Sequence, residues 1–225
     1  MYTRLHIYFD TKTSIKGDIL DRLNKFGILL HRFWDQLSTQ GPVMTLWAGT
    51  DTILRNITGK PVRRLSEITP KIFVGGQPAV SFWDDLLDWG VGAVVNMRGE
   101  YNYSAEVDPL NLPLKFLHLP TVDNEAPSLI HLEQGVDFIR KHIQAEDKGV
   151  YIHCWEGLGR GPTMAAAYFV STGLSPEQAW DKVRQTRPFI RPTDVQKTQL
   201  EAFALHYKPD KAPSPVEIKN EIVTE

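Results

Sequence analysis

Residues 149–168 read GVYIHCWEGLGRGPTMAAAY, an apolar run, a short glycine-bearing loop and a helix-forming run in succession. The apolar residues 149–152 predict a strand, and Pro162 opens a stretch that predicts a helix. The loop between them contains Cys154, the only cysteine of the chain, and ends at Arg160. This order of strand, tight loop and helix N-terminus predicts an α/β domain.

The loop has the chemistry of an oxyanion site. Its glycines allow successive backbone N–H groups to turn inward, and the following helix adds the positive end of its dipole. The guanidinium of Arg160 can hold two phosphate oxygens at once. Helix N-termini and nearby cations also lower the pKa of cysteine thiols, so the same field favours a thiolate at Cys154. We therefore interpret Cys154 as a nucleophile. The alternative is a small buried hydrophobic residue.

The motif His153-Cys154-x5-Arg160 is the signature of the cysteine-dependent protein tyrosine and dual-specificity phosphatases, and the chain resembles that superfamily from about Leu65 to about Tyr207. The resemblance implies a compact α/β domain, a phosphocysteine intermediate, and neither a cofactor nor a metal. It also implies that His153 supports the loop and that the loop binds the substrate phosphate. The implied substrate-binding residues are Trp155, Glu156, Gly157, Leu158, Gly159 and Arg160.

A general acid that protonates the leaving oxygen is expected on a neighbouring loop. The apolar residues 114–119 predict a strand and Ser128 predicts a helix cap, so Asp123 falls on the loop between them. Ligands of open α/β sheets bind beyond the carboxyl ends of strands, which places Asp123 and Cys154 at one mouth. Asp123 also matches the position of the acid in dual-specificity phosphatases. Glu125 is the reserve candidate, and a simple turn role for Asp123 is the alternative.

Two loop residues depart from the superfamily pattern. Gly161 stands where Ser or Thr usually follows the arginine, and in this the loop is similar to phosphatases of regenerating liver. The missing hydroxyl predicts slow breakdown of phosphocysteine, for which Thr163 is at best a partial substitute. Glu156 stands where lipid-directed relatives often carry basic residues. An acid there disfavours highly phosphorylated headgroups, unless its side chain points away from the site.

Other segments resemble the mitochondrial phosphatidylglycerophosphate phosphatase family, namely residues 96–101, 121–123 and 175–179. In that family an acidic–aromatic run stands where this chain has Glu100 and Tyr101. These two residues help to shape the pocket, or else form an ordinary strand exit. The match does not extend to the catalytic loop.

Composition limits the partners of this protein. Of 225 residues, 42% are hydrophobic and 23% are charged, and the net charge is -2, which predicts a soluble globular domain without a nucleic-acid-binding field. A single cysteine excludes an internal disulfide framework and fits a reducing compartment, so we expect a cytoplasmic protein. No apolar run is long enough to predict a transmembrane helix.

Strands and helices alternate after residue 65, which predicts a mostly parallel sheet flanked by helices. The expected strands cover residues 72–74, 92–97, 114–119 and 149–152, and the expected helices cover residues 81–89, 128–145, 162–172, 176 onward and 193–206. We divide the chain into an N-terminal extension (1–64), a phosphatase domain (65–207) and a flexible C-terminal tail (208–225). The extension contains an amphipathic helix over residues 18–37, which either packs on the domain or contacts a membrane surface.

The sequence therefore predicts a phosphomonoester hydrolase, most simply a dual-specificity protein phosphatase that acts on phosphotyrosine and on phosphoserine or phosphothreonine; its partner is a phosphorylated protein or small phosphate ester. A phosphatase of phosphoinositides or phosphatidylglycerophosphate, a phosphate-binding pseudophosphatase and a sulfur or arsenate transferase remain as alternatives. Two further hypotheses concern the end of the chain. Gln196 and Gln199 either orient the hydrolytic water or form a solvated helix face, and either Arg187 or Arg191 reaches the substrate.

Overall fold

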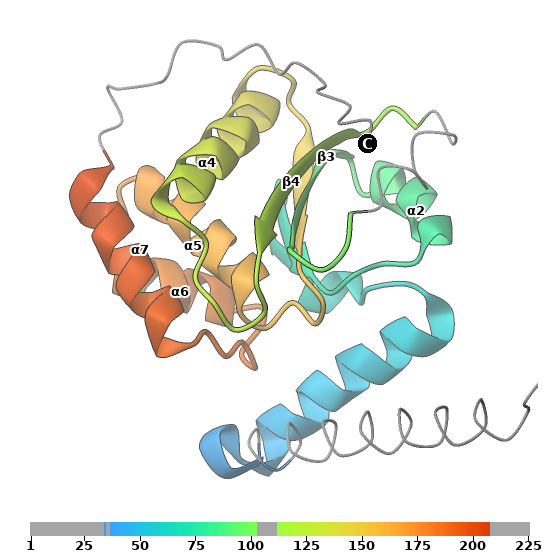
Figure 1. Ribbon diagram of the computed structural model, residues 1–225. Coiled ribbons are helices and arrows are strands. Elements are labelled where there is room, and N and C mark those ends of the chain that lie inside the picture. Colours follow the sequence, from blue (N-terminus) through green and yellow to red (C-terminus); the bar gives the residue numbers. More distant parts are fainter. Residues whose placement is uncertain (1–33, 35–36, 103–111, 208–225) are drawn as a thin grey trace, which may run out of the picture. The chain divides into compact units, whose positions relative to one another are not determined.

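The computed structural model describes residue 34, residues 37–102 and residues 112–207 (Figure 1). It divides into two compact units, Met1–Ala48 and Gly49–Glu225, and the fold described below is that of the second unit. The amphipathic helix expected over residues 18–37 lies outside the described residues except at 34 and 37. The tail expected over residues 208–225 lies wholly outside them.

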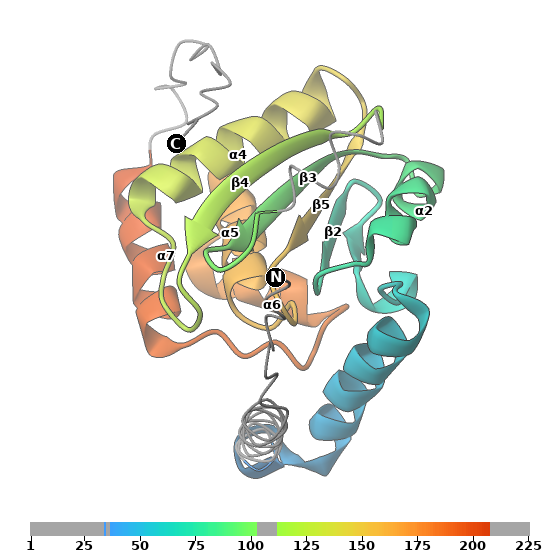
Figure 2. The same ribbon diagram turned by 45° about the vertical axis from the view of Figure 1, so that its right-hand side comes forward.

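The centre of the second unit is a five-stranded sheet with the order β1-β2-β5-β3-β4 (Figure 2). Strand β5 pairs in parallel with β2 on one side and with β3 on the other, and β3 pairs in parallel with β4. Strand β1 pairs with β2 and runs antiparallel to it. The strands are β1 Glu67–Thr69, β2 Ile72–Gly75, β3 Val91–Arg98, β4 Lys115–Thr121 and β5 Gly149–His153. The four predicted strands and the mostly parallel sheet are confirmed. The three-residue β1 is too short to leave a periodic signal in the sequence.

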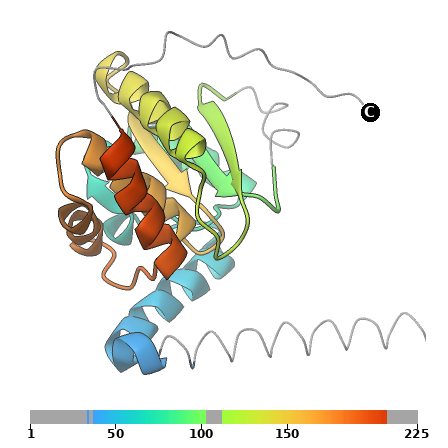
Figure 3. The same ribbon diagram turned by 60° about the vertical axis from the view of Figure 1, so that its left-hand side comes forward.

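Helices cover both faces of this sheet (Figures 1 and 3). On one face α4 and α5 pack against the strands, and α6 and α7 pack against α5, whereas α2 contacts β3 from the other face. The helices are α2 Trp83–Asp88, α4 Leu129–Gln144, α5 Arg160–Ser171, α6 Pro176–Arg184 and α7 Asp194–His206, with short 3-10 turns η1 Arg63–Leu65 and η2 Val80–Phe82. A further helical stretch covers residues 37–58, and Gly41 within it has a φ of 77°.

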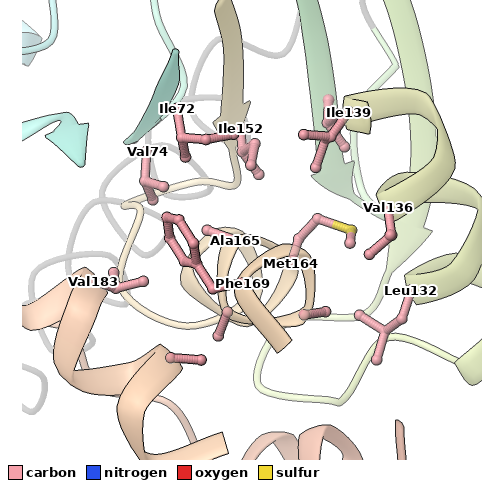
Figure 4. Close-up of a cluster of buried hydrophobic side chains, with 14 of the residues drawn as sticks. Ile72, Val74, Leu132, Val136, Ile139, Ile152, Met164, Ala165, Phe169 and Val183 are labelled. Carbon is pink, nitrogen blue, oxygen red and sulfur yellow. The ribbon is translucent and has the colours of Figure 1, made fainter. Parts of the chain in front are cut away.

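The hydrophobic core consists of two clusters, one on each face of the sheet, because successive side chains of a strand point to opposite faces. Val150 and Ile152 of β5 face α4 and α5, whereas Tyr151 between them faces the cluster around α2. Figure 4 shows the larger cluster, in which Met164 of α5 lies between the sheet and the apolar stripe of α4. Burying one such aliphatic side chain contributes about 1.5–3 kcal/mol, so this cluster holds the helices against the strands, including β5, after which the loop of Cys154 begins.

Side-chain caps fix where three helices begin. The hydroxyl of Ser128 accepts the N–H of His131 at 3.1 Å, as the sequence predicts for the start of α4. Helices α6 and α7 each begin with a capping box, formed by Ser175 with Gln178 and by Thr193 with Gln196. Helix α5 has no side-chain cap and begins at Arg160, two residues before Pro162.

The parallel strands bring their carboxyl ends to one edge of the sheet. Gly75 and Asn96 both pair with His153, and Arg98 pairs with Thr121, so β2, β3, β4 and β5 all end at this edge. The loops that follow these strands therefore meet there. Across residue 34 and residues 37–102 and 112–207, no helix combines the length and the apolar character needed to cross a membrane.

Candidate active site

Cys154 follows directly after β5 and is 4% exposed. Its Sγ accepts the backbone N–H of Gly157 at 3.3 Å, so the loop folds back over the sulfur. Gly157 has a φ of 72°, and a Cβ atom there would lie 2.4 Å from the carbonyl carbon of Gly75. Only glycine fits this position, because both the left-handed backbone and the approach of β2 exclude a side chain.

The carbonyl groups of the loop point away from the sulfur. Each carbonyl oxygen from residue 154 to residue 159 has a hydrogen-bond donor. These donors are, in order, His153 Nδ1 (3.3 Å), Gln77 N (3.0 Å), Arg187 Nη2 (3.5 Å), Arg187 Nε (3.3 Å), Arg191 N (2.7 Å), and Thr163 N and Oγ1 (2.9 Å each). In a planar trans peptide the N–H lies opposite the C=O, so outward carbonyls turn the N–H groups inward. The loop is thus held as an anion-binding nest.

Arg160 closes the mouth of this nest. Its side chain is 1% exposed, yet the guanidinium is hydrogen-bonded on several sides. Nη1 lies 2.7 Å from Glu100 Oε2 and 2.8 Å from the carbonyl oxygen of Thr121, and Nη2 lies 3.1 Å from Glu100 Oε1 and 2.9 Å from Asp123 Oδ1. The structure therefore brings together the predicted cysteine, arginine and aspartate and adds Glu100, which the sequence left open.

The two carboxylates that hold Arg160 reach water. Their side chains are 41% exposed for Glu100 and 46% exposed for Asp123. Partial burial tends to raise the pKa of Glu100, but hydrogen bonds from Arg160 and Arg98 outweigh it and lower that pKa to about 2. Glu100 is thus ionised near neutral pH and forms an ion pair with Arg160.

Arg98 at the end of β3 orders the rim of the mouth. Its Nε donates to Glu100 Oε1 at 3.0 Å, and its guanidinium lies 4.9 Å from the ring centre of Tyr101 and 4.4 Å from that of Trp155. Trp155 remains 44% exposed. The predicted loop tryptophan therefore lies on the rim rather than in the core. Cation–π contacts of this kind contribute about 0.5–1 kcal/mol when exposed.

The loop that carries Asp123 is held by the start of α7. Thr193 Oγ1 donates to the carbonyl of Asn124 at 3.0 Å, Gln196 Nε2 donates to that of Glu125 at 2.9 Å, and Gln199 Nε2 donates to that of Pro127 at 2.8 Å. Gln196 is only 1% exposed, so its interpretation as part of a solvated helix face is wrong. A Cβ atom on Gly159 would lie 2.8 Å from Gln196 Oε1, which keeps that loop position small.

His153 lies beneath the nest. It is fully buried, and its ring stacks on that of Tyr151 with 5.9 Å between ring centres. Burial lowers the pKa of His153 to about 3, so the imidazole is neutral near neutral pH. The hydroxyl of Tyr151 donates to the carbonyl of Gly76 at 2.7 Å, which ties this buried pair to the neighbouring loop.

The other predicted loop residues divide between backbone and side-chain roles. Glu156 and Leu158 are half-buried, and it is their carbonyls that bond Arg187 and Arg191. Thr163 is buried, and its hydroxyl donates to the carbonyl of Gly159 rather than to the sulfur. At Gly161 a Cβ atom would lie 3.6 Å from the backbone N of Cys154, in ordinary contact.

Arg187 is placed differently from the sequence hypothesis. It is 0% exposed and lies on the carbonyl side of the loop, where it cannot reach a substrate at the mouth. Sequence reasoning also missed Arg98, Asp51 and Arg55, all of which are buried near the loop. Asp51 and Arg55 stand in no recognisable motif, because their contacts join segments far apart in the chain. Arg98 lies within the stretch 96–101, but its contacts with Glu100 and Trp155 could not be read from that stretch. Within the described ranges, no group of three or more His, Cys, Asp or Glu side chains is arranged to hold a metal ion.

Known proteins resemble the chain over the region that carries this site. A family profile described as a polymorphic toxin system DSP-PTPase phosphatase matches residues 71–174. The chain is 33% identical over 168 residues to phosphatidylglycerophosphatase and protein-tyrosine phosphatase 1 of Rattus norvegicus, a match that covers 70% of the chain and 84% of that protein. It is 29% identical over 150 residues to dual specificity protein phosphatase 12 of Homo sapiens, covering 65% of the chain and 44% of that protein.

Solved structures of phosphatases are also similar to this chain. A crystal structure of PTPMT1 in complex with PI(5)P superposes with a TM-score of 0.57 and 32% identity, over 61% of this chain and 92% of that one. The crystal structure of Tk-PTP in the active form superposes with a TM-score of 0.57 and 29% identity, over 63% and 97% of the two chains.

Proposed function

Because the chain belongs to the superfamily of dual-specificity and protein tyrosine phosphatases, we propose that it hydrolyses phosphomonoesters through a covalent bond between phosphorus and Cys154. The observation that carries this proposal is the arrangement around the sulfur. Cys154 Sγ lies in a nest of inward N–H groups, and Arg160 at its mouth is bound to Glu100 and Asp123. A phosphate dianion that enters the nest replaces these carboxylates on the guanidinium.

The reaction then proceeds in two balanced steps. The thiolate of Cys154 attacks phosphorus, the S–P bond forms, and the bond to the leaving oxygen breaks as protonated Asp123 gives that oxygen its proton. Water next attacks phosphorus, Asp123 takes a proton from it, and the S–P bond breaks to release phosphate and thiolate. The inward N–H groups and Arg160 stabilise the charge that develops on the equatorial oxygens in both steps.

The first candidate substrate is a phosphorylated protein side chain, tyrosine as well as serine or threonine. Val122, Asp123 and Trp155 are all more than 40% exposed, which supports an open rim. An open rim admits short and long phosphorylated side chains alike. The exposed ring of Trp155 offers a phosphotyrosine ring a flat surface to stack on.

A lipid phosphomonoester is the second candidate. Its support is the likeness to a protein named phosphatidylglycerophosphatase and to a structure of PTPMT1 in complex with PI(5)P. Glu100 and Asp123 place two carboxylates at the mouth, and both are paired with Arg160, so little uncompensated positive charge is left for further phosphates. We therefore propose that a lipid substrate presents one phosphomonoester rather than several.

The test is turnover by the full chain. Para-nitrophenyl phosphate is expected to be hydrolysed by the parent protein and not by Cys154→Ser. Phosphotyrosine and phosphoserine peptides are then compared with vesicles containing phosphatidylglycerophosphate, at equal phosphomonoester concentration. Higher kcat/KM on the peptides supports a protein phosphatase, and higher kcat/KM on the vesicles replaces it with the lipid candidate. Binding of every substrate without release of phosphate by the parent would contradict both and identify a pseudophosphatase.

A further inference from the structure

The underside of the catalytic loop is held by one arginine that takes no part in the steps above. Arg187 is 0% exposed, and its guanidinium donates to three backbone carbonyls, at distances of 3.3 Å to Gly157, 3.5 Å to Glu156 and 2.8 Å to Leu65. Two of these carbonyls belong to the loop itself. The planar guanidinium fixes them with a geometry that a flexible ammonium cannot reproduce.

The charge of Arg187 is balanced from the helical stretch over residues 37–58. Asp51 Oδ2 lies 3.1 Å from Arg187 Nη2, and the two side chains are 3% and 0% exposed. The second carboxylate oxygen of Asp51 is buried and has no hydrogen-bond partner. A half-satisfied buried carboxylate is unfavourable by itself, and the guanidinium is the contact that offsets it.

The same helical stretch is linked to the loop a second time, through Gln77. Arg55, one turn after Asp51, donates from Nη1 to the carbonyl of Gln77 at 3.0 Å, and the N–H of Gln77 donates to the carbonyl of Trp155 at 3.0 Å. A Cβ atom on Gly76 would lie 2.5 Å from Arg55 Nε and 2.9 Å from the Trp155 carbonyl oxygen. Backbone, arginine and catalytic loop are thus packed without spare room.

We propose that Asp51 and Arg187 form a positioning pair that keeps the catalytic loop in its anion-binding conformation. Residues 49–58, which precede the segment matched by the phosphatase profile, are then part of the active-site machinery rather than an appendage. This inference deepens the proposed function and rests on it for the identity of the loop, but not for its test.

The physical argument follows from the peptide geometry of the loop. The carbonyls of Glu156 and Gly157 stay outward because Arg187 donates to them, and the N–H groups of Gly157 and Leu158 stay inward for the same reason. Without the carboxylate of Asp51, Arg187 becomes an unpaired buried charge, which is strongly unfavourable. The guanidinium then turns toward water, the two carbonyls lose their donor, and the inward N–H groups lose their orientation.

The experiment compares Asp51→Asn with Asp181→Asn in the full chain. Asp181 makes an ion pair of similar length with Arg184, 3.2 Å, but both side chains are exposed, so it is a matched control. Two readouts do not need turnover: the pH profile of Cys154 alkylation by iodoacetamide, and the affinity for tungstate measured by calorimetry. Turnover of para-nitrophenyl phosphate is the third.

For Asp51→Asn we expect the alkylation profile to move to higher pH by at least half a unit and tungstate affinity to fall about tenfold. We expect kcat to fall about 100-fold, as a displacement of catalytic groups by about 1 Å can produce. KM for para-nitrophenyl phosphate rises much less than kcat falls. Asp181→Asn is expected to leave the alkylation profile at the same pH as in the parent protein, and to leave tungstate affinity and kcat within twofold of the parent values.

Two further variants keep the test decisive if Asp51→Asn does not fold. Arg187→Lys retains the buried charge but not the planar fork, so it is expected to fold and still to shift the alkylation profile. Asp51→Glu restores the charge and is expected to recover at least half of the lost tungstate affinity. An unchanged alkylation profile and unchanged tungstate affinity in folded Asp51→Asn or Arg187→Lys would overturn the proposal.

Failure of the proposed function would look different. In that case the parent protein would release no phosphate from any substrate, while alkylation and tungstate binding would still report on the loop.

Discussion

The mouth and the underside of the catalytic loop each contain a buried arginine, and the two differ in their partners. Arg160 at the mouth is 1% exposed but is paired with Glu100 and Asp123, whose side chains are 41% and 46% exposed. Arg187 on the underside is 0% exposed and is paired with Asp51, which is 3% exposed. The two guanidinium groups are therefore equally buried. The two regions differ in whether the carboxylates paired with them are exposed to water.

This difference indicates which charge pair can be exchanged. Carboxylates that reach water can leave Arg160 and regain their hydration when a phosphate enters the site. Asp51 has no water to move into, and Arg187 is also bound to three backbone carbonyls. Under the proposed function, substrate is expected to replace the carboxylates paired with Arg160 at the mouth and to leave the pair of Asp51 and Arg187 intact.

The largest effect is expected from replacing Arg160, the arginine at the mouth. Arg160→Lys removes the planar fork that spans two oxygens, and we expect kcat/KM for para-nitrophenyl phosphate to fall about 1000-fold, the scale of losing an oxyanion donor. Arg184→Lys, in the exposed pair with Asp181, serves as the control and is expected to leave turnover unchanged. Retention of more than a tenth of parental kcat/KM in Arg160→Lys would contradict the phosphate-binding role.

The second prediction concerns Asp123, the proposed general acid, whose carboxylate is paired with Arg160 in the structure. Asp123→Asn is expected to lower kcat about 100-fold on an alkyl phosphate, because general acid catalysis contributes about 10²–10⁴-fold. The loss is expected to be smaller on para-nitrophenyl phosphate, whose leaving group needs less protonation. Glu125→Gln is the comparison variant. An equal or larger loss in Glu125→Gln would transfer the acid role to Glu125.

A third prediction concerns the underside and uses the pH dependence of stability. Burial lowers the pKa of His153 to about 3, whereas an unfolded histidine titrates near about 6.5, so the unfolded chain binds a proton that the folded chain excludes. Stability is therefore lost as pH falls from about 6.5 toward 3, by up to about 1.4 kcal/mol per pH unit. Urea unfolding at pH 7, 6, 5 and 4 measures this slope.

The control for this slope is His153→Gln, which is expected to flatten it between pH 6.5 and 4.5. Glu100 loses its stabilising ionisation only below about 4.5, as pH falls toward its folded pKa of about 2, so the slope between pH 6.5 and 4.5 excludes Glu100 and only the range below 4.5 is shared by both groups. His131, whose pKa is also lowered by burial and by the charge of His118, adds a smaller share to the upper window. A slope in His153→Gln equal to that of the parent would show that His153 does not stay neutral in the fold.

The smallest effect concerns the first turn of α5. Gly161→Ser places a hydroxyl where a Cβ atom has ordinary contacts 3.6 Å from the N of Cys154 and from His153. A hydroxyl that donates to the sulfur stabilises the departing thiolate, so we expect breakdown of phosphocysteine to quicken severalfold. Stopped-flow turnover of para-nitrophenyl phosphate measures this as a burst in the parent protein that shrinks in Gly161→Ser. Absence of a burst in the parent would mean that breakdown is not the slow step.

The mouth was largely predictable from the sequence and the underside was not. Cys154 and Arg160 lie within one loop, where their spacing and the flanking strand and helix define the motif. Asp123 was found because the loop after a parallel strand meets other such loops at one edge. The sequence left open whether Arg187 or Arg191 reaches the substrate, because nothing in their neighbours shows which way the chain turns after α6.

The sequence by itself predicted the strand, loop and helix around Cys154 and Arg160 and the alternating α/β framework, since periodicity, glycines and residue spacing are patterns of residues close in the chain. Only the tertiary structure decided that Glu100 holds Arg160, that α7 holds the loop of Asp123, and that Asp51 balances Arg187 across 136 residues. The physical reason is that a charge pair leaves no periodic or local pattern in a sequence. Its strength depends on burial and distance, and both are set only when the chain has folded.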